Sequence, residues 1–203
     1  MTSGRIKPMS IDVVAALQQG PLADIASFKR EALAVHDTLV LPTWMGGPLH
    51  GFNQTLYGYM MRAFSLIDQL SYYWAGTHKQ SQTTRMIDFM EKYMSPDREA
   101  HSIAVQVWRH KLMHTSRPRA LRDPKTGKTL YWLLQWFEPH LPREQHYTFS
   151  DTSDMRMLNL GAIYLIEDIE RAAQAYFVDL KHSAQLQANA ADVEKELASY
   201  SLK

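Results

Sequence analysis

"GFNQTLYGYMMRAFSLIDQLSYYWAG", residues 51–76, decides the fold class that the sequence predicts. Its apolar side chains recur every three or four positions, at Leu56, Tyr59, Met60, Ala63, Ile67 and Leu70. This spacing is typical of one face of an α-helix. Because the run is long and stops at Gly76, the stretch predicts a long helix with a wide buried face.

Upstream of this stretch, proline and glycine divide the chain. Residues 11–19 and 21–41 predict two helices that are separated at Gly20 and Pro21, because proline favours the first turn of a helix over its interior. The Gly- and Pro-rich residues 42–48 predict a loop.

Downstream, residues 81–94 predict a shorter helix that carries four large apolar side chains on one side, Met86, Phe89, Met90 and Tyr93. "SPDRE" follows, with Ser95 as the expected N-cap and Pro96 in the first helical position. It predicts a helix from about Pro96 to about Thr115.

The last third of the chain predicts one hairpin and two helices. Residues 119–136 hold two apolar runs on either side of a turn at 123–127, which favours a short β-hairpin. Thr152 or Ser153 is the expected cap of a long helix that runs through residue 186, and a polar helix over 189–200 is expected to fray.

These elements predict an all-α protein, an elaborated helical bundle with a small β-hairpin inserted after the helix at 96–115. We expect one domain over residues 1–203, with N-terminal helices and a loop at 1–48, the bundle core at 49–186 and a C-terminal helix or tail at 187–203.

Composition excludes several classes of protein. With 45% hydrophobic and 21% charged residues, the chain is not disordered overall. It has no cysteine, which removes disulfides and thiolate chemistry, and it lacks an apolar run long enough for a membrane span. We therefore expect a cytoplasmic protein with no membrane partner.

The net charge of +1 conceals a polarised distribution. Residues 109–128 carry seven lysines and arginines against the single acid Asp123, whereas residues 138–203 carry eleven acids against six bases. The basic segment is either a solvated loop or a surface that meets a polyanion.

The basic segment opens with "RHKLMH", residues 109–114. On a helix with about 100° per residue, His110 and His114 lie on the same arc as Arg109. Asp68, in the middle of the apolar helix, is expected either to pair with Arg109 or a histidine, or to point outward.

Three explanations of this polar strip remain open. The two histidines could bind a metal, although the neighbouring cations Arg109 and Lys111 oppose this. The strip could instead cap the end of its helix. In the third explanation the arginine holds a phosphodiester while the histidines move protons. RNA suits that chemistry better than DNA, because its 2'-hydroxyl is an internal nucleophile and no metal is needed.

"RHKLMH" resembles the R-x4-H signature of the HEPN superfamily, and the helices around it resemble that superfamily's bundle over about residues 50–185. The resemblance implies a metal-independent endoribonuclease of the toxin, phage-defence or RNA-processing kind, which works as a homodimer with one composite site. By position, Arg109 would stabilise the phosphate and His114 would be a general acid or base. His110 would orient groups or transfer a second proton.

The expected site therefore comprises two sets of residues and no metal or cofactor. The catalytic residues would be Arg109, His110 and His114. Further cations would bind the RNA, namely Lys111, Arg117, Arg119 and Arg122. An antitoxin or regulatory protein is an expected partner. The alternative is a non-catalytic HEPN-like module that binds a protein partner or a nucleotide.

Overall fold

The structure is a computed structural model that describes residues 11–37, 52–77, 80–108, 121–123, 125–135 and 141–199. Within these ranges it contains the helices α1 (Ile11–Val35), α3 (Phe52–Ala75), α4 (Gln82–Tyr93), α5 (Arg98–Val107), α7 (Ala162–His182) and α8 (Ala184–Ser199). It also contains the strands β1 (Leu121–Arg122), β2 (Thr129–Gln135), β3 (Phe149–Asp151) and β4 (Met155–Gly161), with a short 3-10 turn at Arg143–Gln145. The all-α class is therefore wrong, because a four-stranded sheet accompanies the helices.

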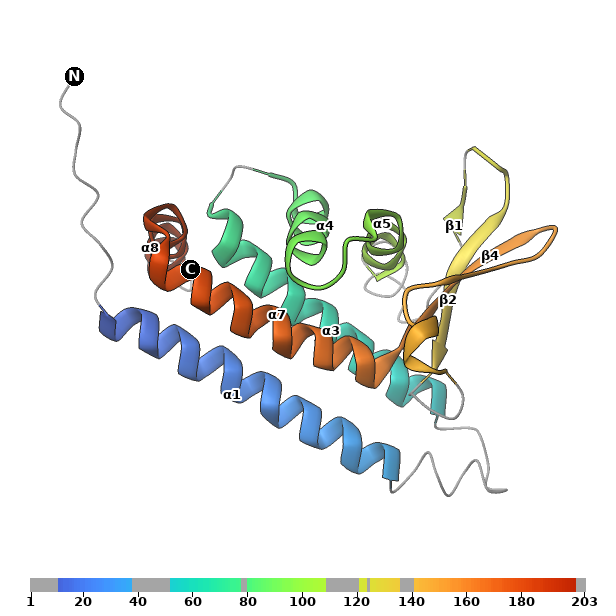
Figure 1. Cartoon of the computed structure of the whole chain (residues 1–203), viewed down its shortest axis with the longest axis horizontal. Coiled ribbons are helices and arrows are strands. Elements are labelled where there is room, and N and C mark those ends of the chain that lie inside the picture. The colour runs from blue at the N-terminus through green and yellow to red at the C-terminus, as the bar shows by residue number, and fades with distance from the viewer. Residues whose placement is uncertain are drawn as a thin grey trace.

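The helices form a layer around α7 (Figure 1). The helix α7 packs against α1, α3, α4 and α8, while α4 lies between α3 and α5. The sheet sits at the end of the helical layer where α7 begins, and α5 covers it through contacts with β2 and β4 (Figure 1). Buried residues from Val14 to Val193 form one hydrophobic cluster.

Periodicity predicted two central helices correctly. The helix α3 spans Phe52–Ala75 and ends at Gly76, whose φ of +77° favours glycine. The helix α4 buries Met86, Phe89 and Met90 as expected. These helices have uninterrupted apolar faces, and their neighbours cover those faces.

The N-terminal prediction of two helices is wrong, because α1 continues through Gly20 and Pro21. Proline inside a helix costs about 3 kcal/mol. The cost is offset by packing on α7, since Ile25, Phe28 and Ala32 are fully buried on one face. Burial of one large apolar side chain contributes about 1.5–3 kcal/mol.

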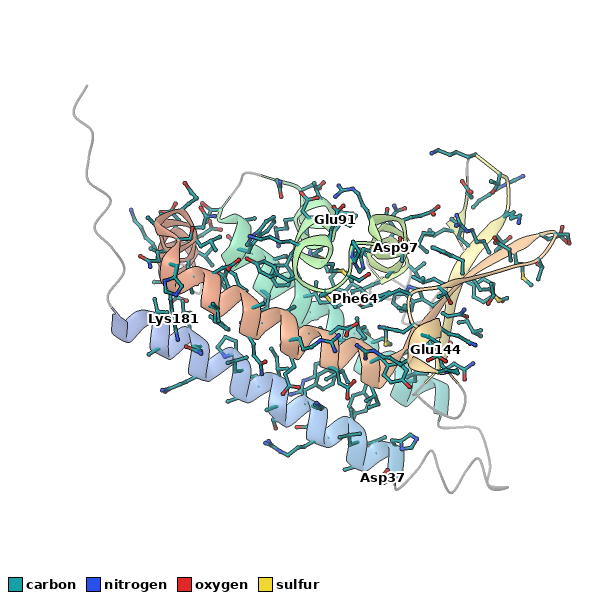
Figure 2. The ribbon with its side chains drawn as sticks, viewed as in Figure 1. Asp37, Phe64, Glu91, Asp97, Glu144 and Lys181 are labelled. Carbon is teal, nitrogen blue, oxygen red and sulfur yellow. The ribbon has the colours of Figure 1, made fainter. Side chains whose placement is uncertain are left out.

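The start of α5 lies two residues beyond the prediction. Asp97, not Ser95, is the N-cap, because its carboxylate accepts from the backbone N–H of Ala100 at 2.9 Å (Figure 2 labels Asp97). Ser95 Oγ accepts from the N–H of Asp97 at 3.3 Å and supports the turn before the helix. The expected continuation of this helix beyond residue 108 lies outside the described residues, as does the expected loop at 42–48.

The sheet explains the largest correction. The predicted hairpin is present as antiparallel β1 and β2, but β2 also pairs in parallel with β4, which pairs antiparallel with β3. The strand order is β1-β2-β4-β3. The expected long helix from Thr152 or Ser153 is therefore wrong in its first part, because residues 155–161 form β4 and α7 starts at Ala162.

The C-terminal helices are divided earlier than predicted. The long helix ends at His182, and α8 starts at Ala184 instead of Asn189. Ser183 Oγ accepts from the N–H of Leu186 at 3.3 Å, so a serine cap starts the last helix. Leu186, Asn189 and Val193 are buried, and Asn189 Nδ2 donates to the carbonyl of Trp74 at 2.6 Å.

No helix in the described ranges is long and apolar enough to cross a membrane.

Candidate functional site

Most of the predicted site lies outside the described residues. This holds for the expected catalytic residues Arg109, His110 and His114 and for the expected binding residues Lys111, Arg117 and Arg119. The described chain stops at Trp108 and resumes at Leu121, so it fixes the two points between which this segment runs. Arg122 is the predicted site residue that the structure describes.

The upstream point is anchored in the core. Trp108 is buried, and its ring stacks on Phe64 of α3 at a centroid distance of 5.7 Å. Phe64, labelled in Figure 2, also stacks on Trp132 of β2 at 5.3 Å, with the rings 8° from parallel. The chain therefore enters Arg109 from a fixed position between α3 and the sheet.

The downstream point opens on a pocket of about 540 Å³. It lies between the β1–β2 turn and the β3–β4 turn, and it is lined by Leu121, Arg122, Thr126, Gly127, Lys128, Thr129, Ser153 and Asp154. Ligand pockets in proteins commonly measure about 300–1,000 Å³. The volume is therefore sufficient for a small ligand or for one unit of a polymer.

Asp123 organises the β1–β2 turn. Its carboxylate accepts from the N–H of Lys125 at 2.9 Å and from the hydroxyl of Thr126 at 2.6 Å, and these hydrogen bonds lower the pKa of Asp123. Gly127 has a φ of +71°, which a residue with a side chain rarely adopts. The "DPKTGK" sequence thus forms a tight turn that places Lys128 at the pocket.

Two cations line the pocket. The Arg122 side chain reaches across the turn, since a Cβ built on Gly127 would lie 3.9 Å from Arg122 Nη2. Arg122 is exposed and makes no ion pair with any described residue. Lys128 Nζ lies 3.7 Å from Asp151 Oδ1, a long and partly exposed contact. Such pairs are weak, so both cations can contact an anionic ligand.

Arg156 differs from these two cations. Its guanidinium binds the Glu99 carboxylate of α5 through two contacts of 2.5 and 3.1 Å, and it lies 4.0 Å above the Phe149 ring. It therefore connects α5 to the sheet and is already occupied. The pair also raises the pKa of Arg156 further.

A second polar cluster, which sequence reasoning missed, is buried where β4 meets α7. His146 Nδ1 accepts from the N–H of Gly161 at 3.0 Å, and His146 Nε2 lies 3.2 Å from Asp168 Oδ2. Asp168 also accepts from Arg143 and Arg171. His146 is buried, with 9% of its surface exposed.

The hydrogen bond from Gly161 decides what His146 can do. A ring nitrogen that accepts an N–H carries no proton, so the neutral ring has its proton on Nε2, facing Asp168. Burial lowers the pKa of His146, and Asp168 opposes this effect only in part. Since Nδ1 is occupied by the Gly161 N–H and Nε2 is buried beside Asp168, without a hydrogen bond to any described residue, we interpret His146 as a structural group and not as a general base.

Tyr147 lies between two imidazole rings. Its ring centroid lies 3.9 Å from that of His146 and 5.0 Å from that of His101, and its φ is +67°. His101 is fully buried, and its Nε2 is 2.7 Å from the carbonyl of Ser95. Burial lowers the pKa of His101 and raises that of Tyr147. This group connects α5 with the start of β3.

Among the described residues, Asp68 pairs with groups that the sequence did not suggest, while its expected partners Arg109, His110 and His114 lie outside those residues. Its carboxylate accepts from Arg85 at 2.6 Å and from Gln82 at 2.6 Å, so it ties α3 to α4. The Arg85 guanidinium also lies 4.7 Å from the Tyr72 ring centroid. Sequence spacing could not identify this partner, because the two helices meet only in the fold.

In the part of the chain that the structure describes, no group of three or more His, Asp or Glu side chains is arranged to hold a metal ion. No protein-family model, no curated protein sequence and no solved structure matches this chain.

Proposed function

We propose that this protein is a metal-independent endoribonuclease of the HEPN type. The observation that supports the proposal best is the pocket with the Arg122 guanidinium, which makes no ion pair with any described residue and follows the Arg109–His114 segment closely in the chain. A basic pocket that follows the proposed proton-transfer segment in the sequence suits a polyanionic substrate. We also propose a cytoplasmic location for the protein, which agrees with an RNA substrate.

In the proposed reaction the RNA supplies its own nucleophile. A histidine, His114 or His110, removes the proton of the 2'-hydroxyl, and the 2'-oxygen forms a bond to phosphorus. The bond from phosphorus to the 5'-oxygen breaks, and a second histidine donates a proton to that oxygen. Arg109 stabilises the charge on the phosphate oxygens. The products are a 2',3'-cyclic phosphate and a 5'-hydroxyl.

The proposed active species is a homodimer. A single segment offers one arginine and two histidines, whereas two segments across a twofold axis provide an acid and a base on opposite sides of the phosphate. In this proposal an isolated monomer does not cleave RNA. A toxin or phage-defence role, held in check by an antitoxin or another regulatory protein, would suit such an enzyme.

The experiment uses the full chain, a labelled RNA and excess chelator. We expect cleavage to a cyclic phosphate end and a 5'-hydroxyl, and we expect Arg109→Ala and His114→Ala each to reduce the rate at least about 10²-fold. Matched controls are Arg30→Ala on α1 and His182→Ala at the end of α7, both exposed positions that should keep full activity.

Three outcomes would contradict the proposal. Cleavage that persists in both Arg109→Ala and His114→Ala would assign the activity to another site or to a contaminant. Cleavage that stops when the chelator is added would contradict a metal-independent reaction. The absence of cleavage by the wild-type dimer would favour the alternative, a non-catalytic module that binds a protein or a nucleotide.

A further inference from the structure

Resting on the proposed RNA substrate, we propose that the pocket between the two hairpins holds one ribose phosphate unit of the chain. Arg122 and Lys128 bind its phosphate, and Asp154 accepts a hydrogen bond from its 2'-hydroxyl. The pocket would then select RNA over DNA at a position separate from the reacting phosphate.

The two turns that form the pocket are held by backbone hydrogen bonds. The N–H of Thr129 donates to the carbonyl of Asp154 at 2.8 Å, which ties the start of β2 to the β3–β4 turn. Across the first turn, the N–H of Asp123 donates to the carbonyl of Lys128 at 2.9 Å. A site built on fixed backbone loses little freedom when it binds its ligand.

The cations of the pocket suit a phosphate. Arg122 offers a planar guanidinium that can donate two parallel hydrogen bonds to phosphate oxygens, and Lys128 adds a compact positive charge. The nearby Arg156 is already bound to Glu99, so it does not compete for the ligand. The pocket therefore provides two anion-binding groups from the two sides of one turn.

Asp154 distinguishes this pocket from a simple anion site. A carboxylate repels phosphate, so its place beside two cations favours a ligand that carries hydroxyl donors next to its negative charge. Asp154 makes no ion pair with any residue in the described ranges. The hydroxyls of Thr129 and Ser153 line the same pocket and add donors and acceptors.

Ribose phosphate combines these features. Its phosphate matches Arg122 and Lys128, while its 2'-hydroxyl is the donor that DNA lacks. The same chemistry is present in an RNA chain and in a free mononucleotide, so the experiment must separate the two sources. An RNA chain is the source that we propose, because the basic hairpin also presents the exposed Lys125 outside the pocket.

The test measures binding in the His114→Ala background, so that RNA stays intact. Fluorescence anisotropy compares a labelled RNA oligonucleotide with DNA of the same sequence, and unlabelled adenosine monophosphate serves as competitor. We expect RNA to bind about tenfold more tightly than DNA, a difference of ~1.4 kcal/mol. Adenosine monophosphate should compete only at concentrations far above those of RNA.

The variants separate the two functions of the pocket. Asp154→Ala should reduce RNA affinity to that of DNA while DNA affinity stays equal or rises, because a carboxylate that repels phosphate is gone. Arg122→Ala should weaken RNA and DNA alike, by about tenfold. Asp192→Ala and Lys195→Ala on α8 are the matched controls and should change neither affinity.

Equal binding of RNA and DNA by the parent protein would overturn the proposal, as would a preference for RNA that survives Asp154→Ala. Adenosine monophosphate that displaces RNA at equal concentration would assign the pocket to free nucleotides and would equally overturn it. These readouts do not depend on catalysis. An RNA preference that requires Asp154, in a protein that never cleaves RNA, would keep the pocket and refute the nuclease.

Discussion

Acidification should destabilise this protein through its buried histidines. In the folded chain, burial lowers the pKa of His146 and of His101, so both rings resist protonation, while in the unfolded chain they titrate near pH 6.5. Below that pH the unfolded state binds more protons than the folded state. The stability that the two neutral rings contribute is therefore fully present above about pH 6.5, and this contribution is lost as the pH falls below that value.

The pKa of His146 is lowered in spite of the charges around it. The charged groups that face it are Asp168 and Arg171 from α7 and Arg143 from the 3-10 turn, and together they do not overcome the effect of burial. The upper limit for one ring, reached when it stays neutral in the folded protein throughout, is a shift of the equilibrium toward unfolding of about tenfold between pH 7.5 and 5.5, or ~1.4 kcal/mol. Together, the two buried rings should lower the free energy of unfolding by up to ~2.7 kcal/mol over this range.

His146→Asn isolates one of the two contributions. The asparagine oxygen can accept the Gly161 N–H in place of Nδ1, and asparagine does not titrate. Urea unfolding, followed by the fluorescence of the buried tryptophans at both pH values, should show a pH-dependent loss of stability that is smaller than in the wild type, by up to ~1.4 kcal/mol. His182→Asn, an exposed position, is the control. An equal loss in His146→Asn and the wild type would refute this reasoning.

Three further predictions concern stability and are measured by chemical denaturation. Gly161→Ala should destabilise the fold by about 1–3 kcal/mol, because its Cβ would lie 2.5 Å from Tyr164 Cδ2, whereas Gly58→Ala, with open space in α3, should stabilise it by about 0.5–1 kcal/mol. Asp97→Ala should cost about 1 kcal/mol through loss of the α5 cap, and an unchanged midpoint would contradict that cap. Phe64→Ala should cost about 3–5 kcal/mol and alter tryptophan emission, because the ring stacks between two indoles.

Local sequence signals predicted the elements whose periodic pattern extends over several turns. The helices α3 and α4 could be predicted because each buries one stripe over several turns, and the β1–β2 turn could be predicted from its Asp, Pro and Gly. The strand β4 could not be predicted. Its apolar residues Leu158 and Leu160 continue into those of α7, and a short apolar run does not distinguish a strand from a buried helix.

In the candidate site, too, some residues could be predicted from the sequence and others could not. A basic residue next to a turn, such as Arg122 at the end of β1, can be recognised in the sequence because its neighbours in the chain build the turn. The pairing of His146 with Asp168 could not be recognised in the sequence, because β3, β4 and the first turns of α7 separate the two residues, which meet only after the sheet has formed. The same is true of Asp154, which reaches the pocket through the pairing of β2 with β4.

The central position of α7 has a consequence for synthesis on the ribosome. The apolar faces of α1 and α3 are covered by α7, which begins only at Ala162. A nascent chain that ends before this helix lacks the element against which both α1 and α3 pack. The helices α1 and α3 therefore cannot cover their apolar faces during translation until α7 has been synthesised and has left the ribosome.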